Sequence, residues 1–197
     1  VKEKNPSLDT IDIGGGMPIP YTRNRSYPVE KLMERMFQLI KKESEKRGMP
    51  HPNLICEWGR YIVAPAQVTI FKIIDTKKIA NKKATAKKWY VLDGSFMNHL
   101  LDTWAIGQKW SVVPLNNKGD DTLEDVWLAG SSCDSDDIYT GVHGYVTLPD
   151  YDMNQGSAPM YIAVMDTGAY QDPLAAHHCM LSSPLKIIAE NGHIVVA

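Results

Sequence analysis

An amphipathic helical pattern near the start of this chain of 197 residues is the feature that most restricts its fold. Apolar side chains recur every three or four residues over 29–40, which is the period of a helix with one apolar face. Ser26 and Pro28 are start signals for this helix, and Gly48 is a stop signal. The pattern therefore predicts one long helix that presents a single apolar side to a neighbouring element.

Strand-like segments stand on both sides of this helix. The first covers residues 8–13, and the second covers 53–75 and is broken at Glu-Trp-Gly-Arg. A helix of this length is sufficient to connect two parallel strands, so the order predicts a β–α–β unit. Met33 and Met36 lie on the apolar face of the helix and are predicted to be core residues of that unit.

Beyond about residue 64 the pattern changes to short β-type runs separated by clusters of Gly, Asn, Asp and Pro. Asn191-Gly192 is a strong hairpin-turn signal within this part. The sequence thus predicts an α/β segment over 1–63 followed by an all-β segment over 64–197. The β-type runs are 68–74, 87–95, 109–115, 124–130, 144–148, 160–165 and 185–197.

Composition excludes several classes of protein. A hydrophobic share of 44% and a charged share of 22% are ordinary for a soluble globular protein, and a net charge of -2 gives no global attraction to nucleic acid or anionic membrane. The lysine-rich stretch 77–88 is typical of a solvated hairpin loop, with a nucleic-acid patch as the weaker alternative.

Three cysteines argue against a disulfide framework and for a reducing compartment. The chain has no secretory leader pattern or apolar run of membrane-spanning length, and both ends have the character of a fragment.

Two short motifs in the first segment allow both a structural and a functional interpretation. Gly14, Gly15 and Gly16 follow a strand, where they would either make a tight exit or turn backbone N–H groups toward an anion. In Cys-Glu-Trp-Gly-Arg, Glu57 and Arg60 would either form a surface ion pair or serve one ligand, with Arg60 on a phosphate and Glu57 on a protonated ring nitrogen.

Two cysteine motifs in the second segment are also ambiguous. Cys133 begins an acidic run, and it could be a small buried hydrophobe, a metal ligand or a reactive thiol beside carboxylates that hold a cation. His177, His178 and Cys179 are consecutive, and adjacent side chains rarely converge on one metal, so a packed or surface role is favoured over zinc.

The order of these motifs is more specific than any one of them. Six motifs follow one another in a fixed order along nearly the whole chain: Asp-Ile-Gly-Gly-Gly, Glu-x-Gly-Arg, Tyr-Val-Leu-Asp-Gly-Ser-Phe, Leu-Asp-Thr-Trp, Cys-Asp-Ser-Asp-Asp and Asp-Thr-Gly-Ala-Tyr-Gln. In this the chain resembles the C-terminal half of the fold type III pyridoxal-phosphate decarboxylases, which include ornithine, arginine and diaminopimelate decarboxylases. Its particular likeness is to bacterial biosynthetic arginine decarboxylase, through 102–115, 133–136, 148–152 and 168–171.

The resemblance implies a fold in two parts. Residues 1–63 would be the last β–α–β portion of a (β/α)8 alanine-racemase-like barrel, and residues 64–197 would be a C-terminal β-barrel or sandwich domain, incomplete without the N-terminal part of the chain. The lysine that binds the cofactor covalently lies on an early barrel strand in this family. It would be absent here, and we expect the isolated chain to be inactive.

The resemblance also implies the site residues. The glycines and Arg60 would hold the phosphate of pyridoxal 5'-phosphate, Glu57 its ring nitrogen, and Tyr170 would donate a hydrogen bond to the phosphate. Cys133 would be the catalytic proton donor after CO2 leaves, supplied by the partner subunit of a homodimer. Asp102, Asp134 and Asp136 would bind the cationic end of the substrate. The cofactor-binding set is Gly14, Gly15, Gly16, Glu57, Trp58, Gly59, Arg60 and Tyr170, with no metal ligands.

The expected function is decarboxylation of a basic amino acid by a cytoplasmic homodimer, with L-arginine converted to agmatine in polyamine biosynthesis. Asp134 after the cysteine speaks against diaminopimelate, where relatives carry Glu-Ser, and Leu101 before Asp102 weakens the ornithine alternative, since ornithine enzymes have an aromatic residue there. Ornithine or lysine decarboxylation, and a non-catalytic regulatory relative, remain the alternatives. Trp58 stands where the family usually has proline, which leaves the shape of that turn open.

Overall fold

The computed structural model describes residues 7–21, 27–116, 122–153 and 158–196, so the start signal at Ser26 lies outside the described residues. The chain divides into two compact units, Val1–Val63 and Ala64–Ala197. We refer to them as unit 1 and unit 2 and describe each by itself.

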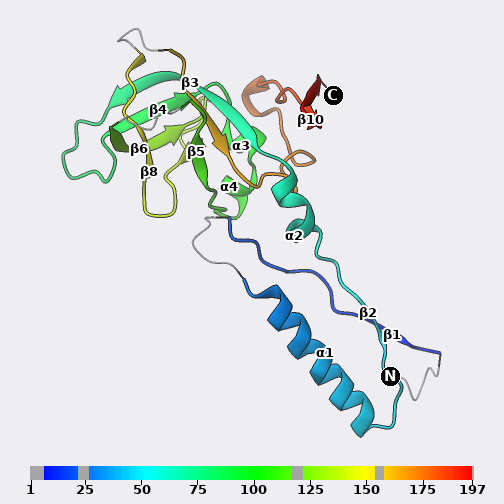
Figure 1. Ribbon diagram of the computed structural model, residues 1–197. Coiled ribbons are helices and arrows are strands. Elements are labelled where there is room, and N and C mark those ends of the chain that lie inside the picture. Colours follow the sequence, from blue (N-terminus) through cyan, green and yellow to red (C-terminus); the bar gives the residue numbers. More distant parts are fainter. Residues whose placement is uncertain (1–6, 22–26, 117–121, 154–157, 197) are drawn as a thin grey trace. The chain divides into compact units, whose positions relative to one another are not determined.

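Unit 1 contains the predicted β–α–β arrangement (Figure 1). Strand β1 (Thr10–Asp12) pairs in parallel with β2 (Asn53–Ile55), with Thr10 opposite Asn53 and Asp12 opposite Ile55. Helix α1 (Val29–Lys46) connects them and is one unbroken helix of 18 residues. The strands are shorter than the apolar segments that predicted them.

Helix α1 ends where its sequence indicates, but its apolar face is not covered. Gly48 has a φ of +58°, the left-handed conformation that closes many helices, and its N–H donates to the Glu45 carbonyl over 3.0 Å. Phe37 is 48% exposed. Met33 and Met36 are only half-buried, so the prediction that they are core residues is wrong. Two strands of three residues offer too little apolar surface to bury this face.

The second strand-like segment folds differently from its β-branched composition. After β2 the chain forms a short helix, α2 (Gly59–Val63), and a 3-10 turn, η1 (Ala64–Ala66), at the start of unit 2. The Ile62 N–H donates to the Trp58 carbonyl over 3.2 Å, which turns a run of high β propensity into helix. The strand predicted for the residues after the break is therefore absent up to Thr69.

Unit 2 is built on a mixed seven-stranded sheet, drawn in Figure 1 as a curved layer. The order is β5-β9-β3-β4-β6-β7, with β8 also paired to β6. The β4–β6 pair is parallel and the other pairs are antiparallel. The strands are β3 (Thr69–Lys78), β4 (Lys88–Leu92), β5 (Val112–Pro114), β6 (Leu123–Ala129), β7 (Ile138–Tyr139), β8 (Val146–Pro149) and β9 (Tyr161–Val164).

A separate hairpin forms near the end of the described chain. Strand β10 (Ile187–Glu190) pairs antiparallel with β11 (His193–Val196). Asn191 and Gly192 have φ values of +50° and +80°, and two left-handed residues between paired strands are what the Asn-Gly signal predicts. Every residue of both strands is exposed.

The core of unit 2 lies on the central strands, where alternate side chains are removed from water. The largest fully buried apolar side chains on these strands and β7 are those of Ile73, Tyr90, Leu92, Leu128, Tyr139, Leu148 and Ile162. After β4 the chain forms two short helices, which are α3 (Phe96–His99) and α4 (Asp102–Ala105). Ser95 caps α3 by accepting a hydrogen bond from the Asn98 N–H over 3.2 Å.

The lysine-rich stretch was predicted to be a solvated loop, and Lys88 at its end differs from this prediction because it is buried. β3 and β4 do form the two arms of a hairpin, but Lys88 is 9% exposed and forms ion pairs with Asp150 and Glu124. Burial lowers the pKa of Lys88, and the bonds to Asp150 and Glu124 outweigh this, so the net shift is upward. Its two partners are distant in sequence, which is why the lysine run alone could not reveal them.

Candidate functional site

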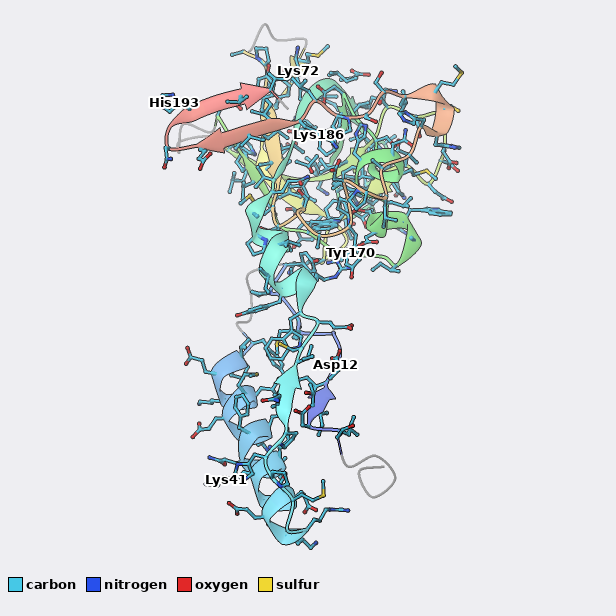
Figure 2. All side chains as sticks on the ribbon, turned by 90° about the vertical axis from the view of Figure 1, so that its right-hand side faces the viewer. Asp12, Lys41, Lys72, Tyr170, Lys186 and His193 are labelled. Atoms are coloured by element: carbon cyan, nitrogen blue, oxygen red, sulfur yellow. The ribbon has the colours of Figure 1, made fainter. Side chains whose placement is uncertain are left out.

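In unit 1 the glycine turn follows directly on β1. Gly14 and Gly16 have φ values of +71° and +90°, which side chains other than glycine rarely adopt. A Cβ on Gly15 would lie 3.1 Å from the Glu57 carbonyl oxygen. The Gly14 N–H donates to Asp12 Oδ1 over 2.8 Å, and Figure 2 labels Asp12 on β1. The turn thus requires glycine for its backbone shape and for its close approach to the next motif.

The Glu57–Arg60 motif is tied to this turn. The Glu57 N–H donates to the Gly14 carbonyl over 2.9 Å, so the ends of the two parallel strands meet. Arg60 Nη1 donates to the Tyr21 hydroxyl over 2.7 Å, and its guanidinium lies 6.0 Å from the centre of the Tyr21 ring. The Glu57 side chain is exposed, Trp58 is half-buried, and Gly59 begins α2. One end of unit 1 therefore combines a glycine turn, a carboxylate and a held guanidinium.

These groups fit the phosphate and ring nitrogen of pyridoxal phosphate. Within residues 7–21 and 27–63, the backbone N–H groups of Gly15 and Gly16 have no acceptor, as an anion-binding turn requires. Arg60, held by Tyr21, adds a positive charge to the same unit, and Glu57 is a carboxylate able to accept a hydrogen bond from a protonated ring nitrogen. The N–H groups and Arg60 are suited to one anion, and the Glu57 carboxylate is suited to one cationic N–H.

In unit 2 the acidic loop after β6 is organised by Asp137. Its carboxylate is 2% exposed and accepts the Phe96 N–H over 2.8 Å and the Ser132 N–H over 3.1 Å. A Cβ on Gly130 would lie 2.1 Å from Asp137 Oδ2, so glycine makes room for this carboxylate. Asp137 thus holds the loop that carries Cys133 and Asp134.

Asp134 and Asp136 occupy the outer part of this loop. The Asp136 N–H donates to Asp134 Oδ1 over 2.9 Å, and the Asp136 side chain is exposed. The other oxygen of Asp134, Oδ2, lies 3.5 Å from His178 Nε2. Asp134 is therefore a partly exposed carboxylate that already faces one nitrogen donor.

Cys133 lies against a second thiol. Its Sγ is 3.4 Å from the Sγ of Cys179, and both side chains are exposed. The hydrogen bond with Cys179, together with the charge of that neighbour, raises the pKa of the Cys133 thiol above its usual range. The buried-hydrophobe interpretation of Cys133 is therefore wrong. Over the described parts of the chain, no three His, Cys, Asp or Glu side chains are placed to hold a metal ion.

Asp102 and Tyr170 are positioned by the segment after β9. Asp102 is 6% exposed; its N–H donates to Gln171 Oε1 over 3.3 Å, and its Oδ2 accepts from Gln171 Nε2 over 2.9 Å. Tyr170 has a φ of +69° and is 51% exposed, and Figure 2 shows it at the surface of unit 2. The strained backbone turns Tyr170 outward while Gln171 is buried against Asp102.

The structure thus makes two groups from the predicted site residues. Unit 1 brings together Gly14, Gly15, Gly16, Glu57, Trp58, Gly59 and Arg60, and in unit 2 one loop joins Cys133, Asp134 and Asp136, while Asp102 and Tyr170 lie on other segments. A groove of about 940 Å³ in unit 2, between β3 and residues 181–189, is lined by none of these residues. Sequence reasoning did not connect Tyr21 or Gln171 with the site, although Gln171 stands beside Tyr170 in the quoted motif. It considered His178 and Cys179 only as packed or surface residues or as a zinc site, and not as neighbours of Asp134 and Cys133.

Comparison with known proteins assigns the chain to a family. Residues 1–64 match the pyridoxal binding domain of the pyridoxal-dependent decarboxylases. Residues 60–168, more than half of the chain, match the C-terminal sheet domain of the same enzymes. The chain belongs to the pyridoxal-dependent decarboxylase family. Pyridoxal phosphate is the cofactor of this family, as the sequence predicted.

Diaminopimelate decarboxylases are among the proteins whose amino-acid sequences are similar to that of this decarboxylase. That of Mycobacterium tuberculosis (strain H37Rv) is 29% identical over 192 residues, 97% of this chain and 41% of the relative. That of Staphylococcus aureus (strain COL) is 27% identical over 193 residues, 98% of this chain and 43% of the relative. The chain spans about two fifths of the length of these relatives. A particular closeness to arginine decarboxylase is not confirmed by these likenesses.

Solved structures confirm the fold prediction. Diaminopimelate decarboxylase from M. jannaschii matches with a TM-score of 0.81 and 22% identity, covering 99% of this chain and 41% of that one. Biosynthetic arginine decarboxylase from Campylobacter jejuni matches with a TM-score of 0.82 and 17% identity, covering 100% of this chain and 47% of that one. The chain accordingly has the fold of a barrel portion followed by a sheet domain. Among the described residues, none of the helices has the length and apolar character needed to cross a membrane.

Proposed function

We propose that this chain acts as part of a pyridoxal-phosphate-dependent decarboxylase of a basic amino acid, with L-arginine as substrate. Family membership supports the reaction class, and the observation that carries the choice of substrate is Asp134. It is a partly exposed carboxylate next to Cys133, with one oxygen facing the nitrogen donor His178. A planar guanidinium is a cation that a carboxylate can meet with two hydrogen bonds.

The residues of unit 1 would hold the cofactor. The N–H groups of Gly15 and Gly16 and the Arg60 guanidinium would bind its phosphate, and Tyr170, which belongs to unit 2, would be a further donor. Glu57 would keep its ring nitrogen protonated, and the ring then supplies the electron sink that lets the α-carboxylate leave as CO2. Trp58 and Gly59 would complete the turn that places Glu57 and Arg60. Tyr21 would restrict the guanidinium to one orientation through its 2.7 Å hydrogen bond.

The residues of unit 2 would hold the substrate and return a proton. Cys133 would donate its Sγ proton to the substrate's α-carbon, and its raised pKa keeps the thiol protonated at neutral pH, as a general acid requires. Asp134 would bind the cationic end, with Asp136 orienting it through the 2.9 Å hydrogen bond from its N–H. Asp102, bonded to Gln171, would contribute a second carboxylate.

The experiment is CO2 release by the full-length protein that contains this chain, with cofactor added, from arginine, diaminopimelate, ornithine and lysine. We expect arginine to give the highest kcat/KM. Cys133→Ala should lower kcat by roughly 10²–10⁴-fold, the usual contribution of a general acid. Cys56→Ala is the matched control, because Cys56 is also exposed and has no proposed role. Release from none of the four substrates, with cofactor bound, would instead support a non-catalytic relative.

Diaminopimelate is the second candidate substrate, because the relatives at 29% and 27% identity are diaminopimelate decarboxylases. This substrate carries a second amino-acid head group, so both a carboxylate and an ammonium group must be received. If diaminopimelate gives the higher kcat/KM and Asp134→Asn leaves that value unchanged, the arginine proposal is wrong. Asp134→Asn should reduce arginine turnover mainly through a higher KM.

A homodimer with shared sites is part of the proposal. Cys133 would act in the site built from the partner's Arg60, so each inactive variant would lack a residue that the other supplies. Mixing Cys133→Ala subunits with Arg60→Ala subunits should restore about a quarter of wild-type activity, since half of the dimers are mixed and each has one intact site. No restoration in a mixture shown to exchange subunits would contradict sharing.

A further inference from the structure

Cys133 and Cys179 form a contact pair of thiols, and the proposed decarboxylation uses Cys133 but neither Cys179 nor the contact between them. They are separated by 46 residues, come from the acidic loop and from the 3-10 turn η3 (His178–Met180), and both are exposed. Their Sγ atoms are 3.4 Å apart. A disulfide has an S–S length of about 2.05 Å, so the atoms need to approach by only about 1.4 Å.

Buried residues place Cys179 beside Cys133. Asn98 is fully buried, and its Nδ2 donates to the His178 carbonyl over 2.9 Å, while its Oδ1 accepts the His178 N–H over 3.0 Å. His99 Nε2 lies 3.0 Å from the Ser182 carbonyl oxygen on the other side of the turn. The segment that carries Cys179 is therefore fastened on both sides of the thiol by residues of helix α3.

The backbone at Cys179 supports the same conclusion. Cys179 and Met180 have φ values of +56° and +59°, although neither is glycine. Such conformations cost energy and persist only where the surrounding structure imposes them. His178 extends the contact between the two segments, with its Nε2 3.5 Å from Asp134 Oδ2. The pairing of the thiols is thus a built feature and does not depend on two mobile side chains meeting.

We propose that Cys133 and Cys179 are a reversible oxidation site, at which a hydroperoxide converts the two thiols into an intrachain disulfide. One thiol loses its proton, its thiolate attacks one peroxide oxygen, and the O–O bond breaks; the displaced hydroxide takes up that proton, so a sulfenic acid and one water are formed. The second thiol loses its proton, its thiolate attacks the sulfenic sulfur, the S–S bond forms and the S–O bond breaks, and the displaced hydroxide takes up this proton to give the second water. Two thiols lose two electrons, and one hydrogen peroxide is reduced to two waters.

The effect on activity rests on the proposed function. A disulfide removes the Sγ proton that Cys133 would donate, so the oxidised enzyme would be inactive until a thiol reductant restores both S–H groups. Because the hydrogen bond with Cys179 raises the pKa of Cys133, thiolate at Cys133 becomes abundant only at alkaline pH. Oxidation should therefore be slow at neutral pH and accelerate as the pH rises.

The experiment follows thiols and activity separately in the full-length protein that contains this chain. Hydrogen peroxide at a small molar excess should lower the mass by about 2 Da and protect Cys133 and Cys179 together from maleimide. Cys56 should stay reactive. Dithiothreitol should reverse the mass change and restore the activity in parallel. Peptide mapping should identify a Cys133–Cys179 cross-link.

Two variants make the outcome decisive. Cys56→Ser should keep the loss of about 2 Da, whereas Cys179→Ser should abolish it and leave Cys133 as a mixed product of sulfenic and higher acids. Peroxide treatment that leaves Cys179 fully reactive toward maleimide in the wild-type protein would overturn the proposal. A cross-link in a protein without decarboxylase activity would overturn the proposed function but not the oxidation site.

Discussion

Asp137 shows how one buried carboxylate sets the conformation of a whole loop. We predict that Asp137→Asn lowers the free energy of unfolding of unit 2 by about 1–3 kcal/mol, because one of the two N–H groups that the carboxylate now receives loses its acceptor and faces an amide donor. The two N–H groups are those of Phe96 and Ser132. The measurement is the denaturant midpoint. Asp136→Asn is the matched control, since that side chain is exposed, and it should change stability by less than about 0.5 kcal/mol.

At the level of single residues, sequence reasoning located the loop but not its internal order. Gly14, Gly16 and the Asn191-Gly192 turn are readable because their backbone angles demand particular residue types. Asp137 stands among three other polar residues of similar character, and only its tertiary contact with Phe96 distinguishes it. The partners of Cys133 and Lys88 are distant in the chain, so no local spacing reveals them.

Asn98 of helix α3 holds the backbone of His178 in the turn that carries Cys179. We predict that Asn98→Ala raises amide hydrogen exchange across residues 176–182, because both hydrogen bonds to the His178 backbone are lost inside the protein. Asn116→Ala is a close control. The Asn116 side chain also makes a pair of hydrogen bonds with backbone groups, the Pro159 carbonyl and the Tyr161 N–H, but in an exposed position. Unchanged exchange in Asn98→Ala would mean that other contacts hold the turn.

Elements were easier to predict than their packing. Periodicity gave α1, and alternation with turn signals gave the strands of unit 2, because these patterns reflect local backbone preference. The short helix α2 was missed, since Tyr61, Ile62 and Val63 all favour strands and only the hydrogen bond to Trp58 indicates otherwise. The two-residue strand β7 is too short to carry a pattern of its own.

The stability of unit 2 as a whole is linked to two tyrosines in its core. The Tyr90 hydroxyl donates to the Pro149 carbonyl over 2.8 Å and accepts the Tyr151 N–H over 2.8 Å. The Tyr139 hydroxyl donates to the Trp110 carbonyl over 2.6 Å and accepts the Trp110 N–H over 2.7 Å. Both side chains are almost fully buried, and burial raises the pKa of each to about 12.

Because an unfolded tyrosine titrates near pH 10, the stabilisation from these two residues is complete below that pH and is lost as the pH rises toward 12. We predict that each tyrosine accounts for a loss of about 2–3 kcal/mol over this range, and the two losses together reach the lower end of the roughly 5–15 kcal/mol by which a typical domain is stable. Circular dichroism and tyrosinate absorbance should change in one step. Tyr139→Phe should lower the free energy of unfolding at pH 7 by about 1–3 kcal/mol. Above pH 10 the stability of this variant should depend less on pH than that of the wild-type protein. Tyrosinate absorbance of all the tyrosines near pH 10, with circular dichroism unchanged, would contradict the link, because the buried hydroxyls would then ionise inside the folded unit.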